Sequence, residues 1–236
     1  MYIVFLVLLL IMLAAIAVLS VFRKKKQTDA IVTEKIRCKK YLLAICHLWG
    51  LLIPIFIMCF IGGISLADIG FRPISFHYNI WFTIVTLILS GVAFVYFIYE
   101  FITSVAGKKS REQDIDKSHD KMMASMLPRT KKEKWLFSFR TLSAAICEEI
   151  LFRGFLLFLL QSVFPDMPIY LIVVIACVIF GIAHIYQGLQ AVISIGLLSV
   201  LFMCLYLVTD SLILAMLLHF ATDFSATFIL SEEQPV

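Results

Sequence analysis

Six ionisable side chains interrupt the apolar C-terminal part of the chain: Glu148, Glu149, Arg153, His184, His219 and Asp223. Carboxylates and imidazoles accept and return protons near neutral pH, so such a set can carry out general acid–base chemistry on water. At the centre of a bilayer each charged group costs roughly 2.5 to 3.5 kcal/mol, or about 10 to 14 kcal/mol for the four acidic and basic groups. Intramembrane groups of this kind face a bundle interior or a water-filled cavity, and they indicate function.

The spacing of these residues assigns them to helix faces. Glu149 and Arg153 are four residues apart with the acid first, which predicts an ion pair on one face of a helix. Glu148 is rotated by about 100° from Glu149, so it can face a cavity while Glu149 is held by Arg153. Two further pairs are also four residues apart: Phe180 with His184, and His219 with Asp223.

The elements that position these residues are membrane helices. The chain of 236 residues is 62% hydrophobic and 15% charged, with a mean hydropathy of +1.00, which excludes a soluble globular domain. Apolar runs of about 20 residues are long enough to cross about 30 Å of hydrocarbon. The sequence therefore predicts an all-α, polytopic transmembrane helix bundle of about seven spans, with six to eight as the range. The runs cover about 2–22, 41–67, 80–105, 131–163, 168–186, 189–208 and 211–231.

The charge distribution predicts the orientation of this bundle. Of the 20 Lys and Arg residues, eight lie in 23–40 and nine in 108–134, so both segments are expected in the cytoplasm. The N-terminus is then outside and the C-terminus is cytoplasmic.

Basic residues follow the first run, which favours a retained span over a cleaved signal peptide. Clusters beside spans are explained by topology and anionic lipid, so the bilayer is an expected partner and nucleic acid is not. Arg140 is expected to reach the cytoplasmic surface.

The fourth run begins with a recognisable capping pattern, and the ionisable groups of the last spans are expected at similar depths in the membrane. Thr130 and Glu133 form a capping-box pattern, and a helix over 131–163 would be about 50 Å long. Counted from the outer ends of their runs, the acidic and imidazole groups reach overlapping depths of about 12 to 24 Å. Breaks at Gly62-Gly63 and Gln187-Gly188 are candidates for re-entrant or split helices.

Three motifs resemble those of one protease family. The segment from Glu148 to Arg153 resembles the EExxxR motif of the CPBP family, the CAAX protease and bacteriocin-processing enzymes also called Abi proteins. Phe180 to His184 resembles its FxxxH motif, and His219 to Asp223 its HxxxN or HxxxD motif. The resemblance covers about 127–231, the expected catalytic helix core, whereas 1–126 match only in general hydropathy.

The resemblance implies an intramembrane endopeptidase, and the residue chemistry permits one. We expect Glu148 to act as general base for a water that His184 also holds, and His219 with Asp223 to bind the developing oxyanion. Arg153 and Glu149 would order the helix face, with Phe180 in support. An ionised Asp cannot donate to an oxyanion as an Asn can, so Asp223 must be protonated or instead orient His219.

A zinc-dependent form of the same protease is the first alternative. Its ligands would be Glu148, Glu149, His184 and His219, whose atoms suit Zn²⁺. We favour no metal, because the Arg153 guanidinium beside the carboxylates opposes a cation.

Two other classes of function fit membrane-embedded acids and imidazoles. One is a proton-coupled transporter, which predicts inverted repeats that the sequence does not show. The other is a catalytically silent membrane protein for bacteriocin immunity or peptide binding. For the protease, the family implies a peptide or membrane-protein substrate, and the compact loops favour a bacterial plasma membrane.

Overall fold

The computed structural model describes residues 1–25, 33–106 and 125–228, and within these ranges it contains helices and turns but no strand. The α-helices are α1 (Tyr2–Lys25), α2 (Glu34–Gly62), α3 (Ile80–Ala106), α6 (Lys131–Glu149), α7 (Leu157–Val163), α8 (Ile169–Ala183), α9 (Leu189–Thr209) and α10 (Leu212–Phe224). A π-helix, η1 (Ile150–Leu156), joins α6 to α7, and two 3-10 helices follow α8 and α10: η2 (Ile185–Gln187) and η3 (Ser225–Phe228).

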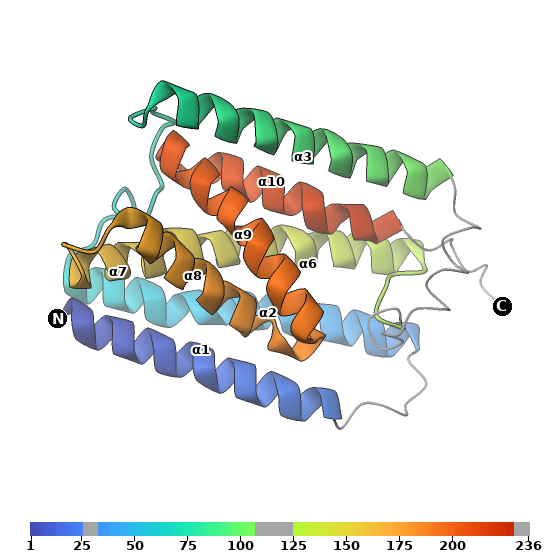
Figure 1. The fold of residues 1–236 in the computed structure, drawn as a ribbon. Coiled ribbons are helices and arrows are strands. Elements are labelled where there is room, and N and C mark those ends of the chain that lie inside the picture. The colour runs from blue at the N-terminus through green and yellow to red at the C-terminus, as the bar shows by residue number, and fades with distance from the viewer. Residues whose placement is uncertain (26–32, 107–124, 229–236) are drawn as a thin grey trace.

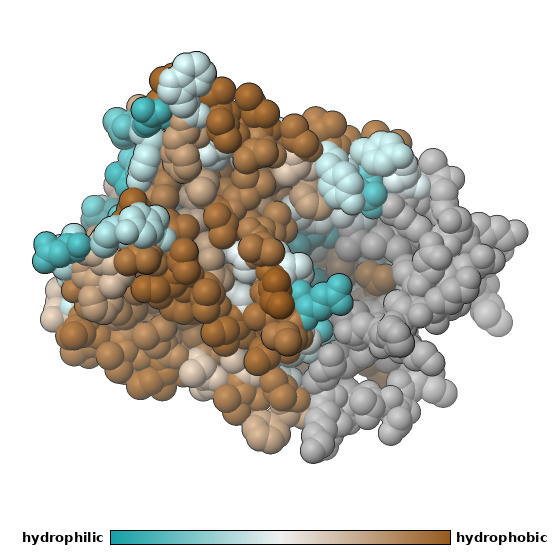
Figure 2. Space-filling view, viewed as in Figure 1, coloured by the Kyte–Doolittle hydropathy of each residue, from teal (hydrophilic) through white to brown (hydrophobic). Residues whose placement is uncertain are grey.

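The predicted helix bundle is confirmed, with one helical rod for each predicted run. In the described part of the chain, α1, α2, α3 and α9 contain stretches long and apolar enough to span a membrane, and α8 and α10 are shorter apolar helices. Figure 2 shows hydrophobic residues over the middle of one face, with hydrophilic residues at the end that carries the turns before α3 and between α7 and α8.

Several helix ends differ from the predicted runs. Helix α2 covers 34–62 and not 41–67, because hydropathy misses its charged first turns and Gly63 ends it in the left-handed conformation at φ 63°. Helix α8 stops at Ala183 and α10 at Phe224, before the ends of their apolar runs. The two glycine breaks lie between helices: Gly63 caps α2, and Gly188 precedes α9.

The continuous rod α6–η1–α7 forms the centre of the bundle. Helices α2 and α10 pack against α6, while α1 and α8 pack against α7. In Figure 1 the helices α8 and α9 lie in front of this rod, and α1 and α3 are the outermost helices. The helix expected over 131–163 is present, but its middle is π-helical and not α-helical, and all seven residues of η1 are buried. Such π segments are frequent at functional sites.

The first turn of α6 is fixed to α2 at the end of the bundle near Lys131. The predicted capping box is present, with Thr130 Oγ1 accepting from the amide of Glu133 and the Glu133 carboxylate accepting from the amide of Thr130. The buried Glu133 carboxylate also pairs with Arg37 of α2. Burial raises the pKa of Glu133, but the bonds from Arg37 and the backbone amides more than offset it, so the pKa lies below its ordinary value.

The opposite end of the bundle is closed by the segment 63–79. The amide of Leu212 donates to the carbonyl of Gly70 at 3.0 Å, and Arg72 pairs with Asp210 at 3.0 Å. These contacts fix the segment to the turn between α9 and α10, where α10, the helix that carries His219, begins.

Helices α8 and α9 approach each other closely at Gly181. A Cβ atom at this position would lie 2.7 Å from the carbonyl oxygen of Val192, so a larger residue does not fit without a backbone shift. This contact lies less than one turn before His184, and it sets the position of that imidazole relative to α9.

Candidate active site

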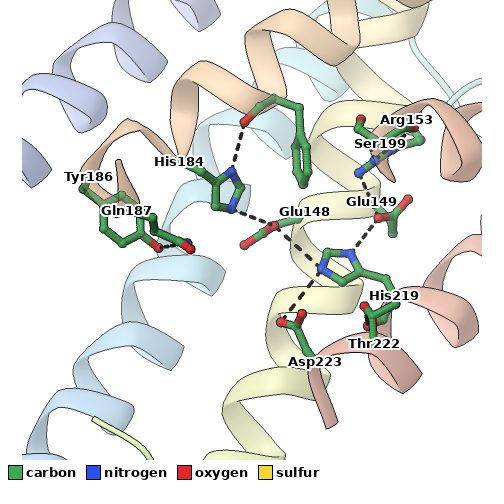
Figure 3. Close-up of polar contacts among 11 residues, drawn as sticks. Glu148, Glu149, Arg153, His184, Tyr186, Gln187, Ser199, His219, Thr222 and Asp223 are labelled. Atoms are coloured by element: carbon green, nitrogen blue, oxygen red, sulfur yellow. Dashed lines mark hydrogen bonds and ion pairs between the residues drawn. The ribbon is translucent and has the colours of Figure 1, made fainter. Parts of the chain in front are cut away.

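Glu148 lies between two imidazoles that come from different helices (Figure 3). Its Oε2 atom is 3.8 Å from Nε2 of His184 at the end of α8 and 4.0 Å from Nε2 of His219 on α10. These separations are too long for direct hydrogen bonds and suit a water molecule held by all three groups. The Glu148 side chain is 18% exposed, so it is not sealed within the protein.

The other nitrogen of each imidazole has an acceptor, which fixes the proton on that nitrogen. His184 Nδ1 lies 2.9 Å from the carbonyl oxygen of Phe180, and His219 Nδ1 lies 2.7 Å from Oε1 of Glu149. Because a carbonyl and a carboxylate only accept, Nδ1 donates in both rings. Each ring therefore turns its Nε2 toward Glu148.

Glu149 and Arg153 form the predicted ion pair, with 2.9 Å between Oε1 and Nη1, and both side chains are fully buried. Arg153 Nη2 also donates to Ser199 Oγ of α9 at 2.8 Å. The guanidinium carbon lies 4.4 Å from the ring centroid of Phe180 and 5.3 Å from that of Phe202. A buried charge pair needs such additional partners, and these hold η1 to α8 and α9.

Asp223 lies one helical turn beyond His219, with its Oδ2 atom 4.0 Å from Nε2 of that ring. The carboxylate that hydrogen-bonds His219 is Glu149 and not Asp223. Asp223 is also the most exposed acid of the group, at 39% of its side chain. It lies on the open side of the site, where a substrate carbonyl can approach.

The four zinc ligands considered from the sequence do not fit one ion. Glu148 faces the Nε2 edge of the His219 ring, whereas Glu149 faces the Nδ1 edge. Oε1 of Glu149 is also bonded to both Arg153 and His219. Among the residues that the structure describes, no group of three or more His, Cys, Asp or Glu side chains is arranged to hold a metal ion.

The structure thus brings together all the residues chosen from the sequence, while their chemical roles stay predictions. Three contributors were missed: Ser199, Phe202 and the bond from His219 to Glu149. Ser199 lies 46 residues from Arg153, and His219 lies 70 from Glu149. No local spacing connects residues so far apart in the chain.

The fold and the site together define a membrane-embedded protein with an acid–base centre between three helices. Residues 130–225 match the family model described as type II CAAX prenyl endopeptidase Rce1-like. This segment, less than half of the chain, is therefore similar to the CPBP family of CAAX proteases, and the long apolar helices together with this similarity support an integral membrane protein. The same comparisons found no matching curated protein and no matching solved structure.

Proposed function

We propose that this protein is an intramembrane endopeptidase in which Glu148 activates a water molecule for attack on a peptide carbonyl. The observation that supports this most strongly is the convergence of Glu148 Oε2 with the Nε2 atoms of His184 and His219 at 3.8 and 4.0 Å. General-base catalysis requires such reach to a shared water. The family description supplies the expected substrate, a prenylated peptide.

In the proposed reaction Glu148 takes a proton from the water as the hydroxide attacks the carbonyl carbon. His184 accepts the second hydrogen bond of the water at its Nε2 atom. His219 donates from Nε2 to the oxyanion, because the carboxylates on either side of its ring stabilise the imidazolium. Asp223 has one of two roles in this reaction: a second donor to the oxyanion if it carries a proton, or a group that orients His219. Glu148 then returns its proton to the leaving amine.

We propose that no metal ion takes part in this reaction. Glu149 is committed to Arg153 and His219, which removes it from the zinc set considered above. Metal analysis of the purified protein, together with turnover in the presence of a chelator, tests this part. Activity that is lost with the chelator and restored by Zn²⁺ would contradict it.

Cleavage of a fluorogenic prenylated peptide by the purified protein in lipid nanodiscs tests the activity itself. We expect Glu148→Gln to lower kcat about 10²- to 10⁴-fold, the usual contribution of a general base. Glu34→Gln, the same change at an exposed position in the first turn of α2, is the matched control and should leave kcat unchanged. A Glu148→Gln protein as active as this control would contradict the assignment, and would leave a transporter or a silent peptide-binding protein.

A further inference from the structure

The 3-10 helix η2 carries two polar side chains that the proposed reaction does not use. Gln187 Nε2 donates to Tyr186 Oη at 3.0 Å, and both side chains are half-buried. Helix η2 packs against α1 and α9, and Gly188, which follows it, has φ 106° and ψ 165°, a conformation open essentially only to glycine. The turn between α8 and α9 therefore holds these two side chains in a defined place.

The Tyr186–Gln187 pair lies next to the catalytic groups. The Tyr186 ring stacks on the His184 imidazole, with 6.2 Å between ring centroids and 30° between ring planes. His184 in turn faces Glu148, with 3.8 Å from Nε2 to Oε2. Figure 3 shows the side chains of Tyr186 and Gln187 beside His184, on the opposite side of Glu148 from His219. A substrate that is bound with its carbonyl at His219 and extends across Glu148 therefore reaches this pair.

Each member of the pair has hydrogen-bonding capacity that no described residue uses. The Tyr186 oxygen accepts from Gln187, so its own proton stays available for donation. The carbonyl oxygen of the Gln187 side chain accepts no hydrogen bond from the described residues. The backbone of a peptide has the complementary groups, and the C=O and N–H of one residue point to the same side of an extended chain. The pair can therefore bind one residue of such a chain through its backbone.

We propose that Tyr186 and Gln187 form a subsite for the backbone of the peptide substrate, in which Tyr186 donates to a carbonyl and Gln187 accepts from the amide of the same residue. This inference rests on the proposed endopeptidase function. Because Tyr186 stacks on the His184 ring, which holds the attacking water in that reaction, the bound residue lies near the scissile bond. Contacts to the backbone are the same for every side chain, so this subsite fixes the course of the chain and leaves its sequence open.

Binding of N-methylated peptides to the inactive Glu148→Gln protein in nanodiscs tests the subsite. Each peptide is the prenylated peptide with one backbone amide methylated, so that it lacks one donor. We expect methylation at one position near the scissile bond to weaken binding about three- to tenfold, and Gln187→Leu in the same background to remove this difference. Gln190→Leu, the same change at an exposed position in the first turn of α9, is the matched control and should keep it.

Steady-state kinetics of Tyr186→Phe separates substrate binding from a purely structural role. Phenylalanine keeps a ring on His184 and removes only the hydroxyl, so we expect KM to rise about three- to tenfold with kcat unchanged. Tyr170→Phe, at an exposed position of α8, is the control for loss of a hydroxyl and should leave KM unchanged. An unchanged KM in Tyr186→Phe would overturn the role of the hydroxyl in the subsite.

The binding experiment distinguishes failure of the subsite from failure of the protease. Equal binding of all the methylated peptides, or a position-specific loss that survives Gln187→Leu, would overturn the subsite, even if the wild-type protein cleaves the unmodified peptide. A position-specific loss that disappears with Gln187→Leu, without cleavage of the unmodified peptide by the wild-type protein, would contradict the proposed protease and leave the subsite standing.

Discussion

At the scale of single residues, the two histidine rings have the most closely defined chemistry in this protein. Each donates from Nδ1 to a fixed acceptor, Phe180 for His184 and Glu149 for His219. This leaves both Nε2 atoms directed at Glu148, the arrangement that the proposed reaction needs. Glu148 and Glu149 are adjacent in the chain but differ in environment. Glu149 is fully buried in an ion pair, whereas Glu148 is partly exposed.

Asp223 provides the sharpest test of the proposed oxyanion site. We expect Asp223→Asn to retain activity, because an amide donates a hydrogen bond as a protonated acid does. Asp223→Ala should lower kcat about 10²- to 10³-fold, the usual loss for one oxyanion donor. Steady-state kinetics with the prenylated peptide measures both variants. Full activity of Asp223→Ala would remove Asp223 from the mechanism.

Local spacing predicted this chemistry only in part. The pair Glu149 and Arg153 follows from their four-residue separation, because neighbours at that spacing meet on one helix face. The contacts of Arg153 with Ser199 and of His219 with Glu149 depend on how α9 and α10 pack against η1. Packing of distant elements leaves no periodic signal in one sequence.

At the scale of elements, the hydrophobic runs predicted the helices well and their ends less well. Capping chemistry explains the difference: the Thr130–Glu133 box could be read directly from the sequence, whereas the charged start of α2 could not be read from hydropathy. The π-helix η1 was also not foreseen, since its buried apolar residues suit an α-helix equally.

The contact of α8 with α9 at Gly181 predicts a specific sensitivity. Gly181→Ala would place a Cβ atom 2.7 Å from the Val192 carbonyl oxygen, and we expect a loss of about 1 to 3 kcal/mol in the free energy of unfolding. Displacement of His184 should also lower kcat. Thermal unfolding followed by circular dichroism, together with turnover, measures both effects.

Gly50→Ala is the control for this substitution. Gly50 lies within α2, and a Cβ atom there would meet nothing within 4 Å. Because alanine is a better helix former than glycine, this variant should be as stable as wild type or slightly more so. Equal stability of the Gly181 and Gly50 variants would contradict the close approach of α8 and α9.

The Glu133 carboxylate predicts a dependence of stability on pH. Its pKa in the folded protein lies below the ordinary value of 4.5, so its contribution is complete above pH 4.5 and is lost as the pH falls through the lowered value. Glu133→Gln should cost about 3 kcal/mol at neutral pH, because it breaks a buried ion pair, and should weaken the acid dependence. Melting temperatures between neutral and acidic pH test this; the same slope in both proteins would contradict it.

At the scale of the whole molecule, the charge distribution predicts how the bundle sits in the membrane. The basic segments 23–40 and 108–134 are expected in the cytoplasm, with the N-terminus outside. The site is then expected to lie within the bilayer.

Protease protection of epitope tags tests this orientation. In intact cells a tag at Met1 should be removed by external protease, whereas a tag inserted after Lys117 should be removed only after permeabilisation. The reverse pattern would contradict the orientation.

The central claim is that this protein cuts peptide bonds with a water activated by Glu148, and it can be measured without a chosen substrate. Mass spectrometry of new peptide C-termini in native membranes compares wild type with Glu148→Gln at equal abundance. We predict a set of new C-termini that is present with the wild-type protein and absent with the variant. Identical sets of C-termini from the two membranes would contradict it.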